Sequence, residues 1–249
     1  MSYSVKTGFR DFASMHSVPR SSTAPARPAL PPPHVGFAGG TKPLPRREEH
    51  HSARADSFRE IRARLLALGE GQNFTTLVVP ASSGSGASYV ARHLAMTFAF
   101  DQAKSALLID CNLRRPSQHT AFGVDVVHGG LLDHLEKPAR EAAPMFYETG
   151  VPRLRLLPAG KARETGIEYF STYRMRALID SLRSAHPDRY LVLDGPALRG
   201  SPDARLLAEL ADFIVIVAAY GRDSADRIMQ AVAGLDPKKI AGVVFNCPP

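Results

Sequence analysis

The residues of this sequence best suited to chemistry form a loop rich in glycine and serine. The segment ASSGSGAS spans residues 81–88, between an apolar run and a stretch with helical periodicity. Backbone N–H groups at the start of a helix attract an anion, and small residues let a phosphate come close to them. A turn of this composition is more often structural, so the loop alone is weak evidence. Its expected phosphate-contact residues are Gly84, Ser85, Gly86, Ala87, Ser88 and Tyr89.

One position of the loop departs from the pattern of nucleotide-binding loops. The Walker A pattern places a lysine directly after the second glycine, and that position is Ala87. The lysine reaches the β- and γ-phosphates and neutralises charge during phosphoryl transfer, which an alanine cannot do. Ser88 stands where a hydroxyl group would bind Mg²⁺. The loop therefore predicts a phosphate site that lacks its principal cation.

Two aspartates follow apolar runs elsewhere in the chain. Asp110 ends the run SALLID, and Asp194 ends the run YLVLD. In one parallel sheet, both carboxylates would lie at the edge where such sheets bind ligands. One could then hold Mg²⁺, directly or through water, together with Ser88 while the other positions a nucleophile, so Asp110 and Asp194 are the candidate catalytic residues. The alternative is that each aspartate caps the loop after its strand, which is less persuasive for two aspartates beside a glycine loop.

These side chains need a sheet that brings several strand ends together, and the sequence predicts one. Apolar runs alternate with helical patterns from residue 74 onward, and continuous apolar runs are typical of strands covered on both faces. We predict an α/β fold with a doubly wound, mostly parallel sheet of the P-loop NTPase type. The expected strands are 74–80, 105–110, 154–158, 190–194, 212–220 and 240–246. The expected helices are 56–68, 89–100, 174–185, 203–211 and 224–235.

The first 55 residues differ in composition from the rest of the chain. They hold eight of its twenty prolines, and their eight Lys or Arg and three acidic residues give +5 of the total charge of +7. Such a segment buries too little apolar surface to offset its ordering entropy. We therefore predict a disordered leader over 1–55 and the globular domain over 56–249. The leader could contact anionic lipid, nucleic acid or an acidic partner, but a soluble linker is the simpler interpretation.

The remaining composition indicates a cytoplasmic protein. Two cysteines, Cys111 and Cys247, do not make a disulfide framework or a metal site. No apolar run has the length of a bilayer span, and the first residues lack the apolar core of a secretory signal. No long block of basic residues occurs, so a nucleic-acid partner is not expected.

Several longer stretches resemble the bacterial tyrosine kinases (BY-kinases) of the CpsD/CapB type, which work with chain-length regulators in capsule and exopolysaccharide assembly. The stretch LLIDCNLRRPSQHTAFG at 107–123 is similar to the Walker A′ segment of that family, and PDRYLVLDGPA at 187–197 to its Walker B segment. LPAG, RMRALIDSLR, SPDARLLAELAD and IAGVVFN match further landmarks between 157 and 246. The resemblance implies ATP and Mg²⁺ as cofactors and an adenine contact at Asn246.

The first predicted helix carries charges at a spacing that also matches the family. Asp56, Arg59 and Arg62 follow the family's E-x-x-R-x-x-R self-association motif, with Asp in place of Glu. Residues three apart lie near one face of a helix and can pair with charges on a neighbour. The resemblance implies a ring-like homo-oligomer or docking on a membrane partner, and a solvated charged face is the alternative.

Four departures from the family bear on activity. Ala87 replaces the Walker lysine, Ser82 occupies the position of the signature lysine of partitioning ATPases, and Asn112 replaces the second Walker A′ carboxylate. The family's tyrosine-rich tail is not found after Asn246. Loss of one preorganised charged donor typically slows transfer about a hundredfold to a thousandfold. Efficient autophosphorylation is therefore not expected, whereas backbone N–H groups could still bind a nucleotide.

Three functional hypotheses follow from these patterns. The first is a catalytically impaired BY-kinase-like component of exopolysaccharide export, holdfast-type polymers included, that acts as partner or regulator of a membrane co-polymerase and lies at the inner membrane through that partner. The second is an active tyrosine autokinase in which Arg114 or Arg115 replaces the lysine. The third is a partitioning-type positioning ATPase, which Ser82 and Ala87 disfavour because such switches use both lysines.

Overall fold

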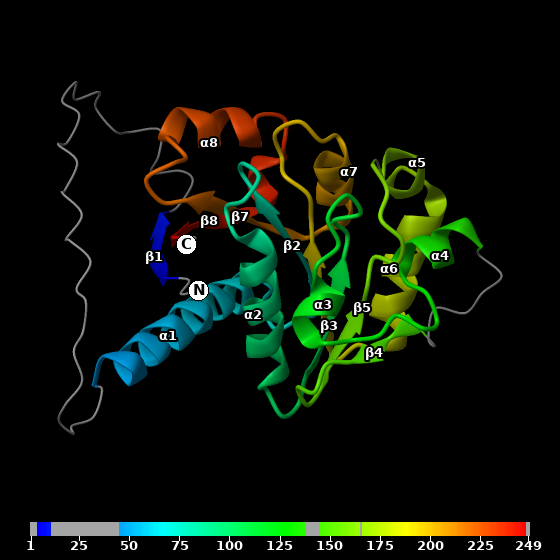
Figure 1. Ribbon diagram of the computed structural model, residues 1–249, viewed down its shortest axis with the longest axis horizontal. Helices are drawn as coiled ribbons and strands as arrows, with labels where there is room; N and C mark the ends of the chain where they lie inside the picture. The colour runs from blue at the N-terminus through cyan, green and yellow to red at the C-terminus, as the bar shows by residue number, and fades with distance from the viewer. Residues whose placement is uncertain (1–3, 11–44, 138–144, 165, 248–249) are drawn as a thin grey trace, which may run out of the picture.

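The computed structural model describes residues 4–10, 45–137, 145–164 and 166–247. Its single eight-stranded sheet lies at the centre of the molecule (Figure 1). The strands are β1 (Ser4–Arg10), β2 (Thr75–Pro80), β3 (Ser105–Asp110), β4 (Tyr147–Glu148), β5 (Leu154–Leu157), β6 (Arg189–Asp194), β7 (Phe213–Ala219) and β8 (Ile240–Cys247). Their order is β1-β8-β7-β2-β6-β3-β5-β4, in which the six strands from β8 to β5 are parallel and both outer strands are antiparallel to their neighbours.

Helices cover both faces of this sheet, because consecutive apolar residues of each strand point to opposite faces. Val78 packs with α1 and α2 on one face, whereas Leu77 and Val79 pack with α4, α6, α7 and α8 on the other. The helices are α1 (Pro45–Leu68), α2 (Ala87–Ala99), α3 (Gln118–Phe122), α4 (Leu131–Glu136), α5 (Ile167–Phe170), α6 (Tyr173–Ala185), α7 (Asp203–Leu210) and α8 (Ala225–Val232), with a 3₁₀ turn at Pro237–Lys239. The predicted doubly wound, mostly parallel α/β fold is confirmed.

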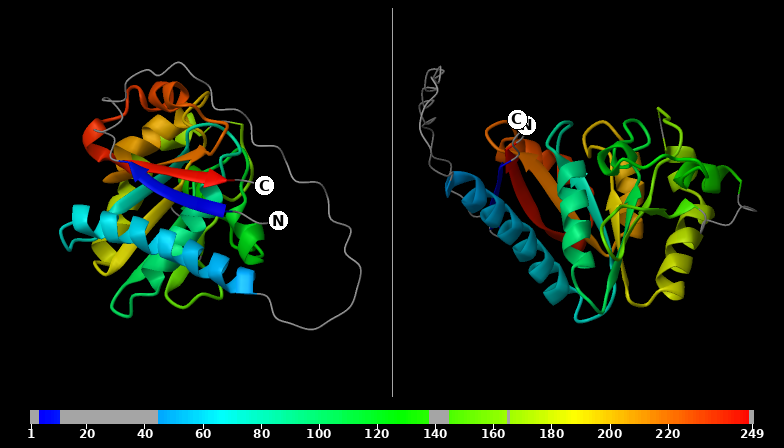
Figure 2. Two further views of the ribbon diagram at one scale, coloured as in Figure 1. Left: turned by 90° about the vertical axis from the view of Figure 1, so that its left-hand side faces the viewer. Right: turned by 60° about the horizontal axis from the view of Figure 1, so that its bottom comes forward.

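Two parts of the leader predicted over 1–55 are described, β1 and the first residues of α1, and its disorder stays a prediction. β1 pairs antiparallel with β8, with Ser4 opposite Cys247, and Figure 2 shows the two strands side by side. An open strand edge accepts any extended backbone, whatever its apolar content. α1 begins at Pro45 rather than at Asp56, and proline suits the first position of a helix. Residues 11–44, and Tyr3 before them, lie outside the described residues.

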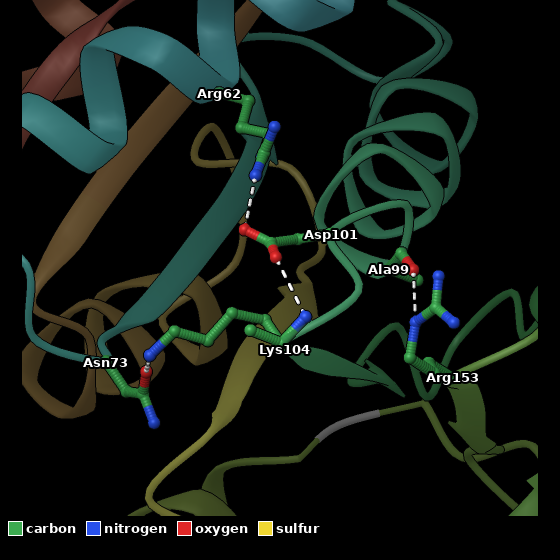
Figure 3. Close-up of polar contacts among 7 residues, drawn as sticks. Arg62, Asn73, Ala99, Asp101, Lys104 and Arg153 are labelled. Carbon is green, nitrogen blue, oxygen red and sulfur yellow. Dashed lines mark hydrogen bonds and ion pairs between the residues drawn. The ribbon is translucent and has the colours of Figure 1, made fainter.

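At the amino end of the parallel strands, side chains join the helices to the sheet (Figure 3). Arg62 of α1 pairs with Asp101 after α2, at 3.0 Å between Nη2 and Oδ2. Lys104 donates from Nζ to Asn73 Oδ1 at 3.2 Å, and Arg153 donates from Nε to the carbonyl of Ala99 at 3.1 Å. These contacts fasten α1 and α2 at the end of the sheet away from the glycine loop. None of the helices in the described part of the chain is both long and apolar enough to cross a bilayer.

Candidate functional site

The glycine loop connects the carboxyl end of β2 to the start of α2. Gly84 and Gly86 have φ angles of 80° and 82°, a left-handed conformation that glycine adopts without strain. α2 begins at Ala87, so the first N–H groups of this helix have no partner within the helix. A cavity of about 680 Å³ opens beside the loop, and residues 83–89 all line it. The loop therefore presents N–H groups to a cavity, and the binding of an anion at this strand-to-helix turn stays a prediction.

Residues at the carboxyl ends of β7 and β8 hold the loop in this shape. Asp223 accepts hydrogen bonds from the hydroxyls of Ser82 at 2.5 Å and Ser85 at 3.1 Å, and from the N–H of Ala219 at 2.7 Å. Partial burial acts against the charged form, but these donors hold the pKa of Asp223 below its usual value. From the other side, Asn246 donates from Nδ2 to the carbonyl of Ser85 at 2.8 Å. The loop is thereby fixed before any ligand binds.

The two candidate catalytic aspartates lie side by side beneath the loop. β3 and β6 pair in a register that places Asp110 opposite Asp194, and both side chains are 0% exposed. Asp110 accepts N–H groups of Asn112 at 3.2 Å and of Ser117 and Gln118 at 3.0 Å each. Burial raises the pKa of Asp110, against the effect of these donors. Burial, and next the charge of Asp110, raise the pKa of Asp194 to about 7.

A glutamine side chain occupies the centre of this arrangement. The amide nitrogen Nε2 of Gln118 donates to Asp194 Oδ2 at 2.6 Å and to the carbonyl of Ser88 at 2.9 Å. The Ser88 hydroxyl donates to Asp194 Oδ1 at 3.1 Å. The predicted Mg²⁺ ligands Ser88, Asp110 and Asp194 are therefore brought together, but neutral donors already engage every carboxylate oxygen. Mg²⁺ prefers six oxygen ligands at about 2.1 Å and usually keeps several waters, so direct binding of the ion to Asp110 or Asp194 would have to share or displace these hydrogen bonds.

The wall of the cavity is basic. Arg92, Arg114, Arg115 and Arg199 line it, and none of its lining residues is Asp or Glu. Outside the cavity, Arg222 lies over the loop and donates from Nη2 to the carbonyl of Ser83 at 2.9 Å. Guanidinium groups match the geometry of phosphate oxygens. The cavity thus combines helix-start N–H groups with arginines, a combination that suits a phosphorylated ligand.

Other residues predicted for the site take different places. Asn246, predicted to contact adenine, lies beneath the loop and is fully buried, and it is not among the residues that line the cavity. Tyr89 lines the cavity and packs on His93, with ring centroids 4.0 Å apart. On α1, Asp56 and Arg59 pair with each other at 2.6 Å, and Arg62 is engaged by Asp101 of the same chain. A role of these three charges in self-association stays a prediction.

Sequence reasoning missed several residues that shape the site. Gln118 lies within the Walker A′-like stretch but matches no pattern of a site residue. The sequence around Arg92 and Arg199 likewise does not mark them as site residues. Asp223 could have been found, because it follows the predicted strand β7 as Asp110 and Asp194 follow theirs. Arg222, its neighbour in sequence, would then have been placed near the loop as well.

Fold and site together define a P-loop-type α/β domain of the doubly wound class. No family model matches the chain. In sequence, the chain is 28% identical over 201 residues to the tyrosine-protein kinase YwqD of Bacillus subtilis, across 80% of this chain and 83% of that protein. It is 29% identical over 201 residues to the succinoglycan biosynthesis transport protein ExoP of Rhizobium meliloti, across 77% of this chain but only 25% of ExoP.

A solved structure gives the same picture for the fold. The kinase domain of the Escherichia coli tyrosine kinase ETK superposes with a TM-score of 0.68 at 23% identity, over 83% of this chain and 81% of that one. The resemblance predicted from the sequence is confirmed: relatives of this chain include bacterial tyrosine-protein kinases, and its fold is that of a bacterial tyrosine-kinase domain.

Proposed function

We propose that this protein is a cytoplasmic, BY-kinase-like component of exopolysaccharide or capsule assembly that acts mainly as a partner or regulator of a membrane co-polymerase. Its similarity to a tyrosine-protein kinase and to a succinoglycan transport protein supports the setting. In this proposal it lies at the inner membrane through its partner, and nucleotide binding serves regulation rather than rapid phosphoryl transfer.

The observation that carries the proposal is the composition of the phosphate site. Ala87 begins α2 and lines the cavity at the position of the Walker lysine. Asp110 and Asp194 are covered by neutral donors and do not line the cavity. Loss of a preorganised cation costs about 3–4 kcal/mol of transition-state stabilisation, and carboxylates enclosed in this way are poorly placed to act on a substrate.

The surface available for partners includes the helix α1. The side chains of Asp56 and Arg59 are 61% and 67% exposed, so their ion pair contributes little stability and can be exchanged for contacts with another molecule. We propose this part of α1 as a contact in a homo-oligomer or with the membrane protein. Arg62 enters that contact only if it leaves Asp101.

Two experiments test the function. Purified protein is incubated with ATP and Mg²⁺ beside Ala87→Lys, and phosphotyrosine is measured; we expect at most trace signal from the native chain. The tagged chain is then isolated from the bacterium that makes it, with surface polysaccharide measured in a deletion strain. Absence of any polysaccharide-export membrane protein from the isolate, together with normal polysaccharide in the deletion strain, would contradict the proposal.

An active autokinase is the second candidate, favoured by the position of Arg114 and Arg115 in the cavity wall. In this case one of the two guanidinium groups neutralises the charge that the lysine would otherwise meet. Strong phosphotyrosine in the native chain that disappears in Arg114→Ala or Arg115→Ala would favour it. Signal that survives both substitutions would come from a contaminating kinase.

A further inference from the structure

The amide of Gln118 joins Asp194 to the first turn of α2. The side chain is fully buried, and it is fixed at both ends: Nε2 donates to Asp194 and Ser88, and Oε1 accepts from Arg92 Nη1 at 3.2 Å. An amide N–H carries partial positive charge and satisfies carboxylate oxygens without adding net charge. Gln118 therefore provides hydrogen-bond donors to oxygens of Asp194 and Ser88 without a metal ion.

Entry of Mg²⁺ would disturb these hydrogen bonds. The amide of Gln118 would have to leave Asp194, and the hydrogen bond from Arg92 to Oε1 of Gln118 would be disturbed. Both carboxylate oxygens of Asp110 already accept backbone N–H groups, three in all, so Mg²⁺ bound directly to them would share or displace these bonds. Each of these buried groups would need a new partner, since buried polar groups left unpaired are costly. The described residues contain no other cluster of His, Cys, Asp and Glu that could hold a metal ion.

The cavity, in contrast, already supplies the charge that Mg²⁺ would bring. Its four arginines line the cavity, and three of them, Arg114, Arg115 and Arg199, form no ion pair with any described residue. A polyphosphate chain carries three to four negative charges near neutral pH, and guanidinium forks neutralise them through paired hydrogen bonds. Mg²⁺ on the same phosphates would compete with the arginines for these oxygens.

We propose that this cavity binds a nucleoside polyphosphate as the free anion, held by the loop N–H groups and the arginines, and without a divalent cation. The inference deepens the proposed function, since it concerns the same nucleotide site. It predicts that binding and phosphoryl transfer are separated in this chain, because a nucleotide bound in this way lacks the ion that assists transfer.

The test is calorimetric titration of the full chain with ATP, once with excess EDTA and once with excess Mg²⁺. We expect binding in EDTA, at least threefold weaker binding with Mg²⁺, and a loss of affinity as salt rises. Tripolyphosphate is expected to bind and adenosine not to bind, which separates recognition of phosphate from recognition of the base. Binding that requires Mg²⁺ overturns the inference, and so does no binding in either buffer.

Two sets of variants sharpen the result. Arg114→Ala combined with Arg115→Ala is expected to weaken ATP binding at least tenfold in EDTA, whereas Arg176→Ala, an exposed arginine of α6 that does not line the cavity, leaves it unchanged. Gln118→Glu places a third carboxylate beside Asp194 and is expected to create a rise in melting temperature with Mg²⁺ that the native chain lacks. If this variant does not fold, the native chain decides: a rise with Mg²⁺ alone contradicts the inference.

Neither the calorimetric titration nor the melting temperature depends on phosphotyrosine or on a partner protein. A chain that binds ATP only with Mg²⁺ overturns this inference and leaves the proposed partner role standing. Metal-free binding in a chain that isolates with no export protein, together with normal polysaccharide in the deletion strain, supports the inference and overturns the proposed function.

Discussion

The two ends of the parallel sheet treat their aspartates in opposite ways. At the amino end, Asp101 is paired with the cation Arg62, and the two side chains are 35% and 25% exposed (Figure 3). At the carboxyl end, Asp110 and Asp194 are fully buried and accept only from neutral groups. A partly exposed ion pair contributes about 0–1 kcal/mol, whereas buried carboxylates are costly unless every oxygen is paired. At the amino end, the aspartate helps to join the helices to the sheet. At the carboxyl end, the two buried aspartates form the centre of the candidate site.

The largest effect is expected from removal of Asp110. Asp110→Ala leaves three N–H groups without their acceptor, all of them on residues of the Walker A′-like stretch 107–123, so we expect unfolding free energy to fall by about 3–5 kcal/mol. The matched change at the other end, Asp101→Ala, is expected to cost about 1 kcal/mol or less. Urea denaturation measures both, and equal losses would remove the distinction between the two ends.

A dependence of stability on pH is the next largest effect. Asp194 has a pKa of about 7 in the folded protein and 3.8 as its reference value, so the folded state binds a proton more tightly than the unfolded state. The contribution of Asp194 is therefore fully present below about pH 4 and is lost as pH rises toward 7, by a few kcal/mol at most. The difference in stability between the native chain and Asp194→Asn should fall across this window. A flat difference would show that Asp194 stays ionised.

A smaller effect is expected for the pair at the amino end. A double-mutant cycle with Arg62→Ala and Asp101→Ala should give a coupling of about 0.5–1 kcal/mol, because the two side chains are about one-third exposed and partly screened. The coupling should shrink as salt is raised from 0.05 to about 0.5 M, where the Debye length becomes comparable to the separation of the charges. A coupling above about 2 kcal/mol would contradict the expected difference in energy between the two ends of the sheet.

The smallest effect on stability is expected at Asp56 and Arg59. Their ion pair is exposed on α1, and either substitution by alanine should change unfolding free energy by less than about 0.5 kcal/mol. Light scattering of the same variants tests the proposed contact, which predicts smaller assemblies at equal concentration. Unchanged assembly size in both variants would exclude this patch from self-association.

The sequence predicted those parts of the site that follow from a single strand and its end. Asp110 and Asp194 could be placed together because β3 and β6 are continuous apolar runs that lead to the same edge. The turn at Gly84–Gly86 could likewise be predicted from the local sequence. Short elements such as β4 and α3 were missed, because two to five residues carry too little periodicity to show a pattern.

Other features depended on contacts that no local pattern encodes. The orientation of Gln118 is set by the turn that follows Pro116, which folds α3 under the loop. The partner of Arg62 lies 39 residues away in sequence, and Asp223 reaches the loop only because β7 is the neighbour of β2. Such positions are decided by sheet order and helix packing, so they can be derived only after the fold is known.

The pairing of β1 with β8 has a consequence for the solubility of shortened chains. β8 is an apolar strand, with Ile240 to Val244 buried, and an uncovered edge of this kind is a template for aggregation with other copies. A fragment that starts at Asp56 would lose β1 and present this edge to solvent. Residues 4–10 therefore protect the edge of β8. We expect a fragment without them to precipitate at concentrations that the full chain tolerates, unless charged residues are placed along β8.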